Sequence, residues 1–137
     1  MNFKRVFMGA ALATSLVVSL SATAEDETSN IDCSNTNLPG KDYVNSHPEF
    51  NKILFENDRI RTFEYTLEPG EKEGCHSHPD VLIYIAKGGT ILSEFEQGDP
   101  AEFIEIEGEA KYIPAGGNHT SENISDEAIV LIITEFK

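Results

Sequence analysis

Residues 75 to 89 read Cys75-His-Ser-His-Pro-Asp-Val-Leu-Ile-Tyr-Ile-Ala-Lys-Gly-Gly89, and the fold of the chain is best approached from this stretch. It places two of the four histidines, His76 and His78, two residues apart just before an apolar run. Side chains two residues apart on a β-strand project from the same face. We therefore expect both imidazoles to point the same way, either as half of a metal site or as polar residues at the end of a strand.

A second cluster lies in residues 108 to 123, Gly108-Glu-Ala-Lys-Tyr-Ile-Pro-Ala-Gly-Gly-Asn-His-Thr-Ser-Glu-Asn123. It predicts a strand, a Pro/Gly turn, and His119 at the start of the next strand. Around the two clusters, short strands are predicted at 52–56, 59–67, 81–86, 90–95, 101–106, 111–113, 119–123 and 128–136, with a loop at 68–74. Many short strands separated by turns indicate an all-β sandwich or barrel.

Together the two clusters resemble the two motifs of the cupin superfamily. The first, Gly-x5-His-x-His-x3,4-Glu-x6-Gly, is matched by Gly70, His76, His78 and Gly89 but lacks its glutamate. The second, Gly-x5-Pro-x-Gly-x2-His-x3-Asn, is matched in full by Gly108, Pro114, Gly116, His119 and Asn123. The resemblance implies an all-β fold, a cupin-type antiparallel jelly-roll β-barrel, in which His76, His78 and His119 bind one divalent metal.

The missing glutamate is the main departure from the family pattern. Leu82 and Ile83 stand where it would be, and strand parity predicts that Leu82 shares the face of His76 and His78. Without that carboxylate, the ion would keep its full positive charge and would favour an anionic or chelating ligand.

Three other polar residues near the motifs are candidates for a role in the site. Asp80 is a candidate metal or water-mediated ligand, with a turn role as the alternative. Tyr84 is expected on the inward face, either as a substrate contact or as an ordinary core residue. Asn123 is expected inward, in a structural or a catalytic role. His47 belongs to no motif and is interpreted as a surface residue.

The predicted ligands favour a transition metal. Imidazole nitrogen suits Fe, Zn, Ni or Cu better than Mg or Ca, and a catalytic ion needs about three protein ligands and an open position. Cupin sites with three histidines and no glutamate resemble those of dioxygenases acting on β-diketones or thiols, so Fe(II) is favoured over Zn, Mn, Ni or Cu. Two alternatives stay open: a Zn or Mn Lewis-acid, isomerase-like enzyme, and a non-catalytic module that binds a small molecule or metal.

The first residues predict export. Lys4 and Arg5 precede an uncharged apolar run at 6–20 and the small residues Ala22-Thr-Ala24, the pattern of a cleaved secretory signal peptide. We therefore expect a signal peptide at 1–24, a polar arm at 25–50 and the barrel at 51–137, in a protein that is most simply periplasmic. In that oxidising compartment Cys33 and Cys75 can pair, although two free thiols remain the alternative.

The charge of the chain bounds its partners. The 137-residue chain carries a formal net charge of −14, and it becomes more negative once Lys4 and Arg5 are removed with the signal. Nucleic acid and anionic membrane surfaces are therefore poor partners. The expected partner is a small molecule, and the edge strands are compatible with a homodimer.

Overall fold

The structure, a computed structural model, describes residues 31–33 and 43–137. In these ranges a four-residue helix is followed by nine strands. The elements are α1 (Tyr43–Ser46), β1 (Asn51–Glu56), β2 (Ile60–Leu67), β3 (Lys72–His76), β4 (Val81–Lys87), β5 (Gly89–Ser93), β6 (Ala101–Glu105), β7 (Ala110–Ile113), β8 (His119–Asn123) and β9 (Ile129–Phe136). The expected all-β class is confirmed, whereas the predicted signal peptide and much of the predicted arm lie outside the described residues. No helix in the described part of the chain is long and apolar enough to cross a membrane.

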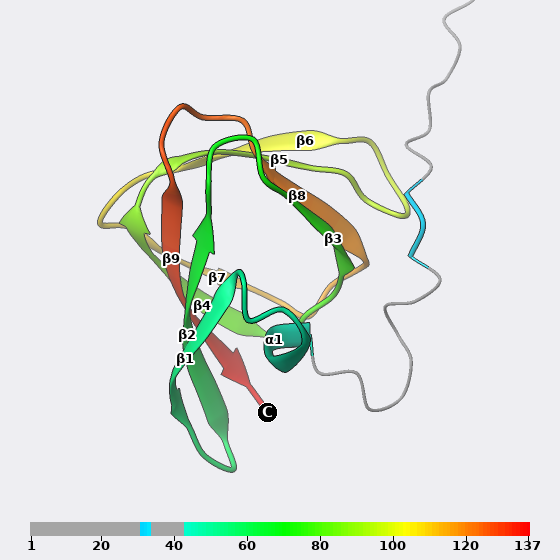
Figure 1. The fold of residues 1–137 in the computed structure, drawn as a ribbon. Helices are drawn as coiled ribbons and strands as arrows, with labels where there is room; N and C mark the ends of the chain where they lie inside the picture. Colours follow the sequence, from blue (N-terminus) through cyan, green and yellow to red (C-terminus); the bar gives the residue numbers. More distant parts are fainter. Residues whose placement is uncertain (1–30, 34–42) are drawn as a thin grey trace, which may run out of the picture.

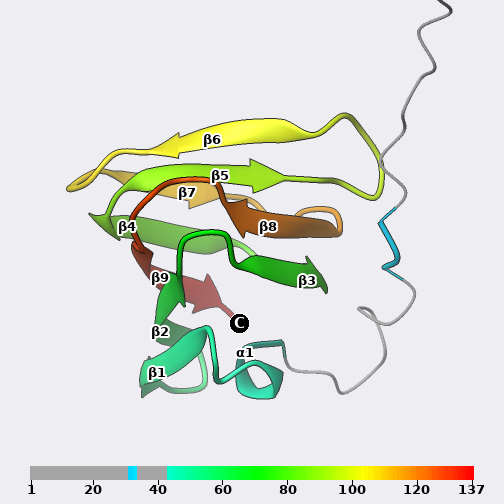
Figure 2. The ribbon, with the colours of Figure 1, turned by 45° about the horizontal axis from the view of Figure 1, so that its top comes forward.

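The strands form two antiparallel sheets that face each other (Figure 1). One sheet has the order β1-β2-β9-β4-β7, and the other has the order β3-β8-β5-β6. In Figure 2 the strands β6, β5, β8 and β3 of the second sheet follow one another from top to bottom, with β7, β4 and β9 of the first sheet behind them. In each sheet, strands that are distant in the sequence lie side by side. The two sheets enclose a common interior, and the predicted jelly-roll barrel is confirmed.

The interior is filled by the alternating side chains of the central strands. On β2 and β4 every second residue is buried, as the period of a strand requires. Each large apolar side chain that is buried in this way stabilises the fold by about 1.5–3 kcal/mol. The main core residues are Val44, Phe63, Tyr65, Leu67, Val81, Ile83, Ile85, Ile91, Ile129 and Leu131.

Strand β4 has the opposite phase from the one expected. Leu82 is 44% exposed and Tyr84 is 48% exposed, so both lie on the outer face and their predicted inward orientation is wrong. The reason is that the chain leaves the extended conformation between His78 and Val81, at Pro79 and Asp80. Strand parity holds only within a continuous strand, so it could not be carried from the histidines into β4.

Strand β3 begins at Lys72, within the segment 68–74 that was predicted as a loop. The loop prediction is therefore wrong for residues 72–74. Glu73 pairs with Ser121 and His76 pairs with His119, with a register shift between the two pairs. Such a bulge inserts an extra residue and changes which side chains share a face. As a result Glu73 and His76, three residues apart, are both buried in the interior.

A disulfide joins Cys33 to Cys75 across 42 residues, with the two Cα atoms 5.4 Å apart. The pairing expected from the sequence is confirmed, and the alternative of two free thiols is wrong. Since Cys75 directly precedes His76, the bridge ties the segment before α1 to the strand that carries this histidine.

Candidate functional site

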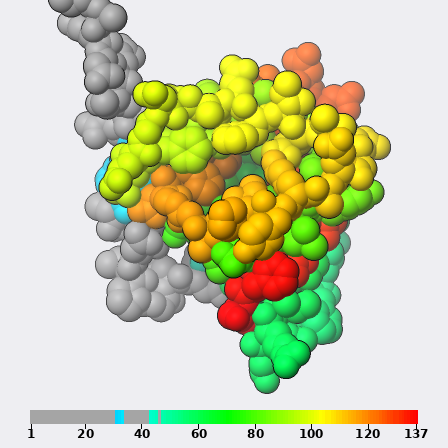
Figure 3. All heavy atoms as spheres, turned by 180° about the vertical axis from the view of Figure 1, so that it is seen from behind, coloured from blue at the N-terminus to red at the C-terminus, as the bar shows by residue number. Residues whose placement is uncertain are grey.

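A cavity of about 260 Å³ lies between the two sheets. Figure 3 shows the molecule from behind, where yellow and orange segments surround a hollow. Most of the cavity surface is apolar, and its aliphatic and aromatic side chains include Phe63, Val81, Ile83, Ile91, Phe95, Phe103, Ile113, Leu131 and Ile133. The polar part of the lining includes Tyr43, Tyr65, Glu73, His76, His78, Ser93, Glu105, Lys111, His119, Ser121 and Glu135. An apolar cavity lining with a few polar groups is typical of small-molecule sites in proteins.

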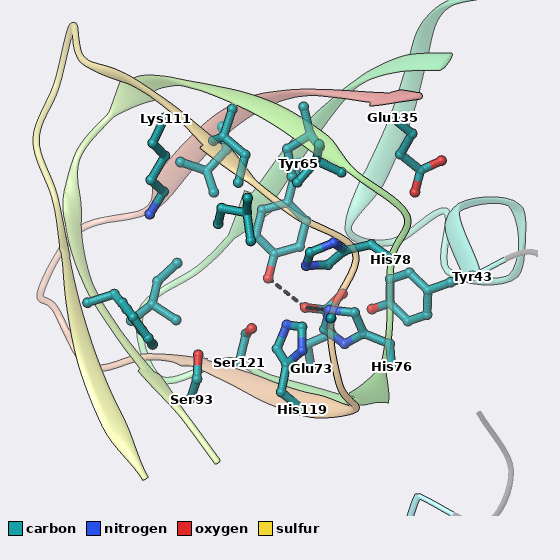
Figure 4. Close-up of a pocket in the computed structure, with 18 of the residues that line it drawn as sticks. Tyr43, Tyr65, Glu73, His76, His78, Ser93, Lys111, His119, Ser121 and Glu135 are labelled. Carbon is teal, nitrogen blue, oxygen red and sulfur yellow. Dashed lines mark hydrogen bonds and ion pairs between the residues drawn. The ribbon is translucent and has the colours of Figure 1, made fainter. Parts of the chain in front are cut away.

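The three motif histidines meet at one end of this cavity (Figure 4). His76 ends β3, His119 begins β8, and the two are paired across the strands. Their ring centroids are 4.4 Å apart, and those of His78 and His119 are 5.4 Å apart. The structure therefore brings together the three residues that the sequence singled out.

Each of these imidazoles is fixed by a backbone carbonyl. The Nδ1 atom of His76 lies 3.0 Å from the Gly74 oxygen, that of His78 lies 2.9 Å from the Pro79 oxygen, and that of His119 lies 3.1 Å from the Gly117 oxygen. A carbonyl can only accept a hydrogen bond, so each neutral ring carries its proton on Nδ1. The Nε2 lone pairs are then left as acceptors or metal ligands, the arrangement typical of metal-binding histidines.

Burial favours the neutral form of these rings. It lowers the pKa of His76 to about 3, with a further contribution from the charge of His119. Burial also lowers the pKa of His119. Since a metal binds the neutral imidazole, both histidines are held in the protonation state that a metal site requires.

The chemistry of the donors fits a transition metal, but the side chains do not form a finished coordination shell. Within residues 31–33 and 43–137, no three His, Cys, Asp or Glu side chains are arranged to hold an ion as they stand. Two imidazoles on one ion at about 2.0–2.1 Å have centroids roughly 4.5–5.2 Å apart. The spacings of 4.4 and 5.4 Å lie just outside this range, so the rings are close to, but not at, the spacing of ligands that share one ion.

Glu73 is a site residue that the sequence interpretation missed. It is only 2% exposed, and its Oε2 accepts a hydrogen bond of 2.8 Å from the Tyr65 hydroxyl. The same oxygen lies 3.6 Å from Nε2 of His76. Burial raises the pKa of Glu73 well above its usual range and also raises that of Tyr65. No motif could have found Glu73, because it lies in the segment predicted as a loop.

Two polar atoms at the histidine end of the cavity have no hydrogen-bond partner among the described residues. They are Oε1 of Glu73 and the hydroxyl oxygen of Tyr43. A buried polar atom without a partner costs about 1–3 kcal/mol. Such atoms are typical of places where a protein meets a ligand, an ion or a water molecule.

Tyr43 of α1 lines the cavity and contacts one of the motif histidines. Its ring stacks on His76 at 4.4 Å between centroids and on His47 at 4.3 Å. His47 is half-buried and does not line the cavity. The short helix allows these contacts because residues 43 and 47 lie one turn apart on the same side of it.

Lys111 lies across the cavity from the histidines (Figure 4). It forms an ion pair with Glu105, whose side chain is only 3% exposed. Oε2 of Glu105 has no partner in the described part of the chain. The cavity therefore has a second polar region, separated from the histidines by aliphatic and aromatic side chains.

The remaining sequence candidates lie outside the cavity lining. Asp80 accepts a hydrogen bond of 2.7 Å from the Ala115 amide, and a hydrogen bond with Tyr112 lowers the pKa of Asp80. This geometry agrees with the turn role that was its alternative. Tyr84 is on the outer face of β4 and cannot contact a molecule in the cavity.

Asn123 has the structural role that was one of its two interpretations. Its side-chain nitrogen donates to the carbonyl oxygens of Leu67 and Glu127, both at 2.8 Å. Its side-chain oxygen accepts a hydrogen bond of 2.9 Å from the Ser125 amide. The side chain is fully buried and joins the end of β2 to the turn before β9, away from the cavity.

No protein-family model and no curated protein matches the sequence. Solved structures do. A cupin domain from Bordetella pertussis Tohama I is 26% identical, with a TM-score of 0.59 over 64% of this chain and 91% of its own. An RmlC-like cupin family protein with a double-stranded β-helix fold from Methanocaldococcus jannaschii is 19% identical, with a TM-score of 0.51 over 63% and 79%. The polyketide cyclase RemF from Streptomyces resistomycificus is 22% identical, with a TM-score of 0.50 over 63% of each chain.

The likenesses to the Methanocaldococcus jannaschii protein and to RemF, at 19% and 22% identity, concern the fold alone. The Bordetella pertussis cupin domain has a higher sequence identity, 26%. These likenesses agree with the antiparallel two-sheet barrel. The chain therefore has the double-stranded β-helix fold of the cupins. Its likeness to the Bordetella pertussis cupin domain supports a place in the cupin superfamily.

Proposed function

We propose that this protein binds one divalent transition metal through His76, His78 and His119. The observation that carries the proposal is that three histidines line one end of a single cavity, each with Nδ1 held by a backbone carbonyl. This leaves three Nε2 lone pairs for one ion. The cupin fold supports the proposal because the same motif positions supply the histidines.

A small chelating substrate fits the rest of the cavity. The aliphatic and aromatic lining would hold an apolar body and exclude water, while the histidine end would receive an anionic or chelating group. A divalent ion there would supply Lewis acidity and, as Fe(II), redox chemistry with O2. We therefore propose a dioxygenase-like reaction on a small chelating substrate as the first candidate activity.

A Lewis-acid reaction with Zn(II) or Mn(II) is the second candidate, and Glu73 is the observation that favours it. Such chemistry usually needs a general base within hydrogen-bond reach of the substrate. Neither Asp80 nor Tyr84 lies in the cavity, but the Glu73 carboxylate does. Binding of a small molecule or metal without turnover is the third possibility.

The first experiment measures metal content by elemental analysis of the mature protein and of two variants. We expect about one equivalent of metal in the wild type, and its loss in a His76→Ala/His119→Ala double variant. His47→Ala is the matched control, because His47 contacts Tyr43 but does not line the cavity. Equal metal loss in the control, or a wild type that takes up none, would contradict the proposal.

The second experiment separates the candidate activities. Iron-loaded protein is tested for O2 consumption with β-diketones, thiols and chelating acids. Substrate-dependent uptake that the double variant lacks supports the dioxygenase-like candidate. Absence of uptake across the panel removes this candidate, and a shift of the melting temperature by the same compounds then indicates binding alone.

We also propose that the protein is exported by a signal peptide at residues 1–24. The disulfide supports this proposal, because such bridges persist in oxidising compartments. Amino-terminal sequencing of protein from the periplasmic fraction is expected to begin at Glu25. Recovery of the full-length chain from the cytoplasm would contradict it.

A further inference from the structure

The buried carboxylate of Glu73 lies 3.6 Å from Nε2 of the motif residue His76, and both residues belong to β3. The family pattern places its glutamate after the second histidine, where this chain has β4. Here the register shift between Glu73 and His76 turns both side chains into the interior. A carboxylate is therefore present at the histidine end of the cavity although the first motif lacks one (Figure 4).

Only one of the two carboxylate oxygens of Glu73 has a hydrogen-bond partner among the described residues. Oε2 accepts the hydrogen bond from Tyr65, which fixes the orientation of the carboxylate. Oε1 is buried and has no hydrogen-bond partner in the ranges that the structure describes. The side chain is only 2% exposed, so bulk water does not compensate for the missing contact. A cation beside the histidines would supply it.

The spacing of Glu73 and His76 suits two ligands of one ion. Nε2 of His76 lies 3.6 Å from Oε2 of Glu73. Two donors bound to one ion at about 2.0–2.2 Å are roughly 3.0–3.6 Å apart, depending on the angle at the metal. The Nδ1 atom of His76 is held by Gly74, so it is Nε2 that faces the carboxylate.

We propose that Glu73 is a fourth protein ligand of the metal and replaces the glutamate that the first motif lacks. This inference rests on the proposed function, since it assumes the three-histidine site. Tyr65 acts as a positioning residue, because its hydroxyl holds the carboxylate toward His76. The consequence is a less positive site with one fewer open position for substrate than three histidines alone would leave. A coordinated Glu73 is no longer free to act as the general base of the Lewis-acid candidate.

The test is a titration of metal-free protein with Co(II), whose visible absorption depends on the ligands and geometry of the ion. Wild type, Glu73→Gln, His119→Ala and Glu105→Gln are compared, with affinities measured by competition against a chelator. Glu73→Gln keeps the size of the side chain and an acceptor for Tyr65. Glu105→Gln is the matched control, because it removes a second buried carboxylate of the same cavity, on β6.

We expect Glu73→Gln to bind Co(II) at least tenfold more weakly than the wild type and with a changed visible spectrum. Glu105→Gln is expected to keep the affinity and spectrum of the wild type. If Glu73→Gln matches the wild type in both readouts while His119→Ala loses the metal, Glu73 is not a ligand and the three-histidine proposal stands. If the wild type binds no Co(II), both proposals fail.

A second measurement covers the case in which Glu73→Gln does not fold. Wild-type protein labelled with carbon-13 at the glutamate carboxylates is examined by infrared difference spectroscopy, with and without Co(II). Coordination is expected to shift a glutamate carboxylate band, and this shift is expected to persist in Glu105→Gln. No shift on metal binding would overturn the inference.

Discussion

Removal of the Cys33–Cys75 disulfide is expected to destabilise the barrel by about 4 kcal/mol. The bridge closes a loop of 42 residues in the unfolded chain, and the chain-entropy relation gives about 13 cal/mol/K for a loop of that length. At room temperature this is about 4 kcal/mol, which corresponds to a fall of roughly 10–20 °C in the melting temperature of a domain of this size.

The assay is urea unfolding of the mature protein, followed by circular dichroism. A Cys33→Ala/Cys75→Ala variant is compared with the wild type, and the wild type is also measured in reductant, so that removal of the bridge is separated from the substitutions. The slope of free energy against urea should increase, because an unfolded chain without the bridge exposes more surface. A loss below about 1 kcal/mol in both comparisons would refute the entropic account of this bridge.

Five further substitutions test assignments made from the structure. Asn123→Ala is expected to cost about 2–4 kcal/mol, because three hydrogen bonds of a buried side chain are lost, and to leave Co(II) affinity unchanged. A larger effect on metal binding than on urea stability would contradict its structural role. Ile83→Ala is expected to cost about 2–5 kcal/mol and Tyr84→Ala to change stability by at most about 0.5 kcal/mol, because only the first faces the core. Similar losses in urea would show that the faces of β4 are misassigned. Gly88→Ala should cost about 1–3 kcal/mol, because its Cβ would overlap the backbone of β6, whereas Gly74→Ala has open space. Thermal unfolding of this pair decides the point, and equal melting temperatures would count against the overlap.

The sequence predicted the fold class and the three histidines because both depend on local patterns. Alternation of apolar residues has the period of a strand, and the turn residues mark where each strand ends. His76, His78 and His119 were predicted to meet because they occupy family positions, and the two-sheet barrel does bring them to one end of the cavity.

Side-chain direction across interruptions was decided by the tertiary structure. Parity is lost at Pro79 and Asp80, so Leu82 and Tyr84 face outward although counting from the histidines predicted the opposite. The bulge in β3 turns Glu73 inward for the same reason. A sequence pattern contains no information on such a shift, because the shift depends on how β3 pairs with a strand more than forty residues away.

What the sequence by itself determined is therefore the set of strands, the family motifs and the two cysteines able to pair. What only the tertiary structure decided is the polar environment of the histidines: Glu73 beside His76, Tyr43 stacked on the same ring, and the carbonyl that orients each imidazole. The physical reason is that periodicity acts along one strand, whereas burial and unpaired polar atoms arise only when two sheets close on each other.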